Sequence, residues 1–115
     1  MIRSSKKIPY GRHCLDEDDI QAVVEVLENG PITQGQKVEE FGQALANYTG
    51  AKYGVALSSG TAALHLSIVA MEIGPGDEVI TTPITFCATA NAVLYQGADV
   101  RFVDIDDDTL NINPE

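Results

Sequence analysis

The sequence predicts an α/β protein in which short parallel strands alternate with helices. Apolar runs at residues 53–57, 78–82 and 100–103 are typical of strands. Stretches with helical spacing at residues 61–73 and 86–96 lie between them, and turns rich in Gly and Pro separate the elements. Because βαβ units build parallel sheets with helices on their faces, this alternation predicts a β-α-β-α-β order.

The chain of 115 residues is expected to begin with an extended arm over residues 1–14, where Pro9 and Gly11 discourage helix. Residues 15–115 are then expected to form one partial domain. Its third strand is the last predicted element, so the predicted sheet is incomplete and has an uncovered edge. We therefore expect either a longer parent protein or missing elements that another chain supplies.

Two amphipathic helices are predicted to precede the strands. Asp16 is suited to cap the first, and the acidic residues 17–19 complement its dipole. The Asn-Gly-Pro sequence at 29–31 should end this helix, and Gly50 should end the second. Helical spacing marks one apolar face on each, with Ile20, Val23, Val24 and Leu27 in the first and Val38, Phe41, Leu45 and Tyr48 in the second.

In the third predicted helix, at residues 61–73, the spacing of Leu64, Ile68 and Met71 predicts that these side chains face the core. Gly42 weakens the prediction of the second helix slightly, since glycine is a poor helix former.

The turn at residues 58–61, Ser-Ser-Gly-Thr, joins the first predicted strand to the third predicted helix. Unpaired amides and the helix dipole make such a junction an anion site, and Gly60 lets the backbone approach the anion closely. The plainer interpretation is that Ser and Thr simply cap the helix. Neither G-x-G-x-x-G nor G-x-x-x-x-G-K-[ST] is present, so the sequence supports neither a Rossmann fingerprint nor a P-loop.

The composition excludes several classes of protein. A formal net charge of −10 argues against binding to nucleic acid or to an anionic membrane surface, although a local site can still bind an anion. Cys14 and Cys87 lack metal-ligand spacing and are expected to be reduced thiols. The basic N-terminus lacks a following apolar segment, so no signal peptide is expected, and the apolar runs are too short to span a bilayer.

Six ordered segments carry a shared pattern, namely IPYGR (8–12), GPITQG (30–35), SSGTAAL (58–64), GPGDEVITTPITF (74–86), ATAN (88–91) and GADVRFVDID (97–106). Together they resemble the DegT/DnrJ/StrS family of aminotransferases, which depend on pyridoxal 5′-phosphate (PLP) and act on nucleotide-linked keto-sugars. Within that family the pattern looks most like the transaminases of the pseudaminic acid pathway. The resemblance spans nearly the whole chain but only the opening part of the family's length.

The resemblance implies the N-terminal part of the large domain of a fold-type I PLP aminotransferase. It also implies site residues. Backbone groups of Gly60, Thr61 and Ala62 would bind the PLP phosphate, and Phe86 would stack on the pyridine ring, a flat apolar wall suited to a planar cofactor. The implied contacts with the sugar nucleotide come from Tyr10, Gly30, Pro31, Ile32 and Thr33. An isolated Phe, Tyr or Thr at these positions would otherwise be read as a core, surface-anchoring or turn residue.

The implied reaction moves an amino group from an amino acid, with glutamate expected, to a nucleotide-linked 4-keto sugar in the synthesis of surface glycans. A cytoplasmic homodimer with shared active sites is implied as well. None of the chain's lysines, Lys6, Lys7, Lys37 and Lys52, lies in the family's motif for the lysine that bonds to PLP. No catalytic residue is therefore expected here, and the chain alone should be inactive. The alternatives are an interaction or dimerisation module and a dehydratase or regulatory relative on the same scaffold.

No metal site is expected. Asp104, Asp106, Asp108 and Glu115 have the spacing of calcium ligands in an EF-hand, but Thr109 stands where that loop requires Gly. An acidic turn that leaves a strand is the simpler interpretation.

Overall fold

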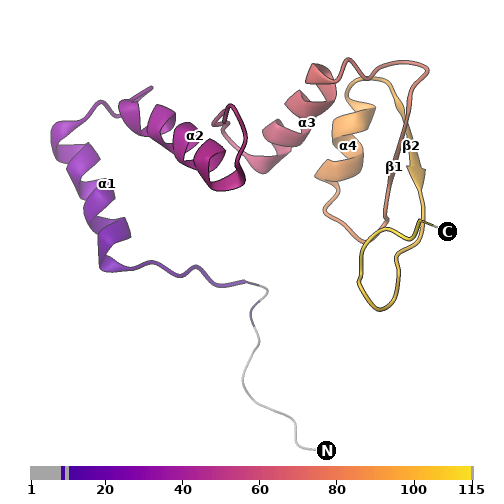
Figure 1. Cartoon of the computed structure of the whole chain (residues 1–115), viewed down its shortest axis with the longest axis horizontal. Coiled ribbons are helices and arrows are strands. Elements are labelled where there is room, and N and C mark those ends of the chain that lie inside the picture. Colours follow the sequence, from indigo (N-terminus) through magenta and orange to yellow (C-terminus); the bar gives the residue numbers. More distant parts are fainter. Residues whose placement is uncertain (1–8, 10, 115) are drawn as a thin grey trace, which may run out of the picture. The chain divides into compact units, whose positions relative to one another are not determined.

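The computed structural model describes residues 9 and 11–114, and the predicted substrate residue Tyr10 lies outside them. The chain divides into two compact units, residues 1–55 and 56–115. None of the helices in the described part of the chain has the length and apolar character needed to cross a lipid bilayer. The described elements, labelled in Figure 1, are α1 (Glu17–Asn29), α2 (Gln36–Thr49), α3 (Gly60–Ala70), β1 (Glu78–Thr81), α4 (Ala88–Leu94) and β2 (Asp99–Phe102).

Helix α1 begins and ends where its local chemistry predicts. The Asp16 carboxylate accepts from the Asp19 amide at 3.0 Å, and the Asp19 carboxylate accepts from the Asp16 amide at 3.1 Å. This reciprocal pair satisfies amides that have no partner inside the helix. Gly30 forms the C-cap, so both predicted ends of α1 are confirmed.

Helix α2 makes an unusually close contact through glycine. Gly42 is buried, and a Cβ built on it would lie 2.7 Å from the carbonyl oxygen of Gly54. The backbone at Gly54 therefore lies directly against α2, beside the buried Ala46. Gly42 thus permits packing that any side chain would prevent, which outweighs its poor helix propensity. Gly50 closes the helix in the left-handed region with φ +72°, as predicted.

The first predicted strand, residues 53–57, is not formed, so the expected β-α-β-α-β order is wrong at its first element. A strand requires a hydrogen-bonded neighbour, and the only sheet among the described residues pairs β1 with β2. The apolar pattern of residues 53–57 does not show whether another strand lies beside them to form these hydrogen bonds.

In the second unit, β1 and β2 form a parallel pair in which Val79 lies opposite Val100. Helix α4 packs against both strands and against α3. The buried cluster between these elements consists of Ile68, Ala92, Val93 and Ala98, with Ile73, Val79 and Val100 packed around it.

Helix α3 differs from the prediction in length and in its inner face. It ends at Ala70 rather than at residue 73, and only Ile68 of the three predicted inward residues is buried. Leu64 and Met71 are exposed. Because α3 is apolar on every side, the spacing of its apolar residues could not identify the face that packs on α4.

Candidate cofactor site

The N-terminus of α3 leaves two amides free. The Ser59 hydroxyl accepts from the Ala62 amide at 3.1 Å, and the Ser59 carbonyl accepts from the Ala63 amide at 3.0 Å. The capping interpretation is therefore correct for Ser59. Within the described residues, the amides of Gly60 and Thr61 have no partner. Of the three predicted phosphate donors these two are available, whereas the Ala62 amide already serves the cap.

These amides and Phe86 meet in one hollow. It has a volume of about 590 Å³, within the ordinary range for small-molecule sites. Phe86 is 73% exposed, so its ring is not used in the core of this chain. A Cβ on Gly60 would meet nothing within 4 Å, which leaves room for a ligand beside the backbone. The hollow is lined by Gly60, Thr61, Ala63, Leu64, Ser67, Phe86 and Ala88.

The donor set suits PLP. Two bare amides at the positive end of a helix dipole match a phosphate, and an exposed aromatic ring matches a planar pyridine. None of the residues lining the hollow carries a charge, so the helix N-terminus alone supplies the attraction for the anion.

The backbone of Phe86 is held by the first turn of α4. The Thr89 amide donates to the Phe86 carbonyl oxygen at 3.0 Å, and the hydroxyls of Thr85 and Thr89 are hydrogen-bonded at 3.0 Å. These contacts tie the segment before α4 to the helix itself. The position of the aromatic wall therefore follows from the position of α4.

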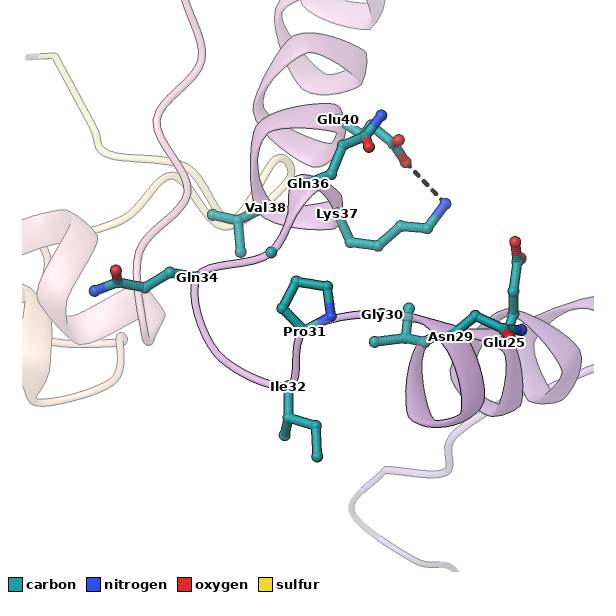
Figure 2. Close-up of a pocket in the computed structure, with 12 residues that line it drawn as sticks. Glu25, Asn29, Gly30, Pro31, Ile32, Gln34, Gln36, Lys37, Val38 and Glu40 are labelled. Carbon is teal, nitrogen blue, oxygen red and sulfur yellow. Dashed lines mark hydrogen bonds and ion pairs between the residues drawn. The ribbon is translucent and has the colours of Figure 1, made fainter.

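The predicted substrate loop borders a separate hollow of about 480 Å³ in the first unit (Figure 2). Gly30, Pro31 and Ile32 line it, whereas Thr33 does not. Lys37 lies on its wall and pairs with Glu40 at 2.8 Å, with both side chains largely exposed. The hydrogen bond to Glu40 raises the pKa of Lys37, and the charges of Glu40 and Glu25 act in the same direction.

Sequence reasoning missed several lining residues in both hollows. Ala63, Leu64 and Ser67 follow Gly60 at three, four and seven residues, the spacing of one helical face. That spacing was visible in the sequence and could have found them. Lys37 and Glu40 are three residues apart in a helix, a spacing that predicts their ion pair. The spacing does not predict that both residues line a hollow.

The acidic segment after β2 forms a turn that the side chain of Asp106 stabilises. The Asp106 carboxylate accepts from the Thr109 amide at 2.8 Å and from the Asp108 amide at 3.1 Å. An antiparallel bridge joins Ile105 to Ile112 across this turn. Among residues 9 and 11–114, no group of three or more His, Cys, Asp or Glu could hold a metal ion.

The Asp106 turn should weaken in acid. The Thr109 amide holds the pKa of Asp106 below its ordinary value. A carboxylate with a lowered folded-state pKa stabilises the fold above its unfolded pKa, and this contribution is lost as the pH falls through the folded-state pKa. A carboxyl NMR titration should give a lower midpoint for Asp106 in the native chain than in urea. Equal midpoints would contradict the hydrogen-bonded turn.

Comparisons with known proteins give the family of the chain. A helix N-terminus with free amides beside an exposed aromatic ring is suited to the phosphate and the planar ring of PLP. The model of the DegT/DnrJ/EryC1/StrS aminotransferase family matches residues 13–115, and the chain belongs to this family.

Curated relatives include two sugar-pathway proteins that are similar to the chain. The spore coat polysaccharide biosynthesis protein SpsC of Bacillus subtilis is 49% identical over 107 residues, covering 93% of this chain and 28% of SpsC. The UDP-4-amino-4-deoxy-L-arabinose–oxoglutarate aminotransferase of Shewanella sediminis is 45% identical over 107 residues, with the same coverage of 93% and 28%. The chain therefore spans about 28% of the length of these relatives.

Solved structures show the same fold over most of the chain. PseC of Helicobacter pylori, an aminotransferase involved in pseudaminic acid biosynthesis, has a TM-score of 0.85 at 38% identity, covering 94% of this chain and 29% of PseC. Spr1654 of Streptococcus pneumoniae, solved in its PLP form, has a TM-score of 0.83 at 38% identity, covering 94% of this chain and 28% of that protein. The aminotransferase fold expected from the sequence is thus confirmed, and PLP is the cofactor of the family.

Proposed function

We propose that the chain forms the phosphate-holding N-terminal part of a PLP-dependent sugar aminotransferase. The parent enzyme transfers an amino group from an amino acid, glutamate, to a nucleotide-linked 4-keto sugar in surface-glycan synthesis. The observation that carries this proposal is the meeting of the Gly60 and Thr61 amides with the Phe86 ring in one hollow. The roles of SpsC in spore coat polysaccharide synthesis and of PseC in pseudaminic acid synthesis support the sugar class.

In this proposal the residues of the chain hold the cofactor and shield it. When bound, PLP supplies an electron sink for the transfer of the amino group. The amides of Gly60 and Thr61 donate to its phosphate, and the Phe86 ring fixes the plane of the pyridine and excludes water from that face. Because backbone amides do not titrate, these donors stay competent at any working pH. The lysine that bonds to PLP comes from outside this chain.

The loop at Gly30, Pro31 and Ile32 is our proposed contact for the sugar nucleotide, together with Thr33 and Tyr10. Support comes from the hollow that the first three residues line. Glu25 and Glu40 also line this hollow, and their two negative charges exceed the single positive charge of Lys37. The net negative charge of the lining disfavours an anionic diphosphate there. We therefore assign the sugar end of the substrate to this loop. The parent enzyme is proposed to act in the cytoplasm as a homodimer with shared active sites.

The full-length protein should test the proposal directly. We expect it to show a PLP absorbance band that shifts when glutamate is added, and to aminate a nucleotide-linked 4-keto sugar. A correctly folded full-length protein without such a band would contradict the assignment.

The chain alone should behave differently. After incubation with PLP and borohydride reduction, mass spectrometry should find no PLP attached to Lys6, Lys7, Lys37 or Lys52, because none belongs to the family's lysine motif. Efficient trapping on one of these lysines, compared with a PLP-treated sample that was denatured first, would overturn this part of the proposal.

One observation favours a second candidate, an interaction module that pairs with a complete subunit. The apolar faces of α1 and α2 are exposed, including Phe41 and Leu45. Exposed apolar faces of this kind mark surfaces that another polypeptide covers. A natural reading frame that lacks the lysine-bearing segment would favour this candidate over the enzyme.

A further inference from the structure

A hydrogen bond outside the hollow joins α3 to the end of α4. The side-chain Nε2 atoms of His65 and Gln96 lie 2.7 Å apart, and both residues are half-buried. The His65 ring also meets the Tyr95 ring edge-on, with the two centroids 5.3 Å apart. In the described part of the chain, no other side-chain hydrogen bond joins α3 to α4 or to the turn that follows it.

Gln96 is itself held by the last turn of α4. Its backbone amide donates to the carbonyl oxygen of Val93 at 3.0 Å, and Val93 is only 2% exposed. The partner of His65 therefore moves with α4. Because the first turn of α4 also holds Phe86, the His65 hydrogen bond and the aromatic wall share one support.

Apolar packing alone does not set the rotation of α3 about its own axis. Hydrophobic contacts are non-directional, and α3 is apolar on every side, so a roll of this helix on α4 exchanges one apolar surface for another. A hydrogen bond, in contrast, weakens steeply when its angle changes. The bond between His65 and Gln96 thus supplies a directional contact that the packing of Ile68 does not.

The rotation of α3 decides where its free amides point. His65 lies one helical turn after Thr61, so the two residues share a face. A roll of about 25° moves atoms at the Cα radius of about 2.3 Å by about 1 Å, enough to misalign hydrogen bonds to an anion. We propose that His65 and Gln96 are positioning residues, which hold α3 so that the amides of Gly60 and Thr61 face the phosphate of a cofactor stacked on Phe86. This inference rests on the proposed function.

Both residues act through the position of α3. Neither His65 nor Gln96 lines the hollow, so neither contacts a ligand bound there. The Gln96 amide can donate to a neutral imidazole or, turned over, accept from a protonated one. The bond is therefore retained when the protonation of His65 changes, which suits a permanent link rather than a pH switch.

A comparison of PLP with pyridoxal tests the inference, because pyridoxal has the same ring and lacks the phosphate. In the full-length protein, Gln96→Met keeps the length of the side chain and removes both polar atoms, whereas Gln96→Glu keeps an oxygen that can accept from His65. The matched control is Gln43→Met, which removes another glutamine hydrogen bond, to Asn47, in the first unit. Absorbance titration of each apoprotein gives both dissociation constants, and thermal unfolding checks the fold.

We expect Gln96→Met to weaken PLP binding about tenfold, the effect of impairing one hydrogen bond to a charged group, and to change pyridoxal binding by less than about twofold. Gln96→Glu and Gln43→Met should bind both ligands as tightly as the wild-type protein. If Gln96→Met fails to fold, His65→Phe takes its place, since it keeps an aromatic ring beside Tyr95, and it must show the same loss specific to the phosphate.

Three results would overturn the inference. Unchanged PLP affinity in Gln96→Met would do so and leave the proposed function intact. Equal losses of PLP and pyridoxal affinity would also do so, because they indicate general damage to the site. A folded wild-type protein that binds no PLP would overturn the proposed function and this inference together.

Discussion

Replacing Gly42 with alanine should destabilise the first unit by about 1–3 kcal/mol, the usual cost of forcing extra atoms into a packed contact. The added Cβ would come 2.7 Å from the Gly54 carbonyl oxygen and 3.3 Å from its carbonyl carbon. Both are backbone atoms, which cannot rotate away as the end of a side chain can. The backbone of residues 53–55 must then move off α2.

The sign of this effect is what makes it informative. In an ordinary helix interior, glycine to alanine stabilises by about 1 kcal/mol, because alanine is the better helix former. Gly54→Ala should destabilise in the same way, since its Cβ would meet the backbone of Gly42 and come 3.3 Å from the Ala46 amide nitrogen.

Urea unfolding followed by far-UV circular dichroism, with hydrogen exchange of the α2 amides, would measure both variants. The matched control is Gly60→Ala, also a helical glycine, whose Cβ would meet nothing within 4 Å. Its stability should stay the same or rise slightly. If Gly42→Ala raised the unfolding midpoint as well, the contact between Gly42 and Gly54 would not exist in solution.

Replacing Phe86 with alanine should weaken PLP binding to the full-length protein by about tenfold. Aromatic stacking contributes about 0.5–1.5 kcal/mol beyond the area buried, and 1.4 kcal/mol corresponds to a factor of ten in affinity. Because Phe86 is 73% exposed in the chain, its removal should cost the fold of this unit little. Titration of the apoprotein with PLP, followed by the absorbance band, gives the affinity.

Two companion variants separate stacking from general damage. Phe86→Tyr keeps the aromatic face and should restore most of the affinity. Phe102→Ala removes another exposed phenylalanine of the same unit that does not line the hollow, and should leave PLP binding unchanged. Unchanged affinity in Phe86→Ala would remove Phe86 from the cofactor site, whereas equal losses in Phe86→Ala and Phe102→Ala would indicate a structural effect.

Local chemistry made parts of this protein predictable from sequence. Asp16 and Asp19 mark the start of α1 because their side chains bond amides only three residues away. Gly50 marks the end of α2 because its left-handed conformation suits glycine. The free amides at Gly60 and Thr61 follow equally from the start of a helix, whose first amides have no partner within the helix.

Long-range contacts decided the rest. Residues 53–57 have a strand pattern but no strand partner in the described chain, because pairing is a property of two segments. The spacing of apolar residues could not choose the inner face of α3, since every face is apolar and only packing on α4 selects Ile68. In the sequence, Gly42 only lowers the helix propensity of α2. The contact that requires glycine at this position, with the backbone of Gly54, is a property of the tertiary structure.

The sequence by itself determined both ends of α1, the C-terminal end of α2, the family and the position of the turn that we propose as the anion site. Each of these depends on residues within a few positions of one another or on their order along the chain. Only the tertiary structure decided that Phe86 lies beside that turn, that Thr33 does not line the same hollow as its neighbours, and that Leu66 and Val69 of α3 are exposed. Those features depend on how separate helices and strands pack, which the pattern of any one segment does not encode.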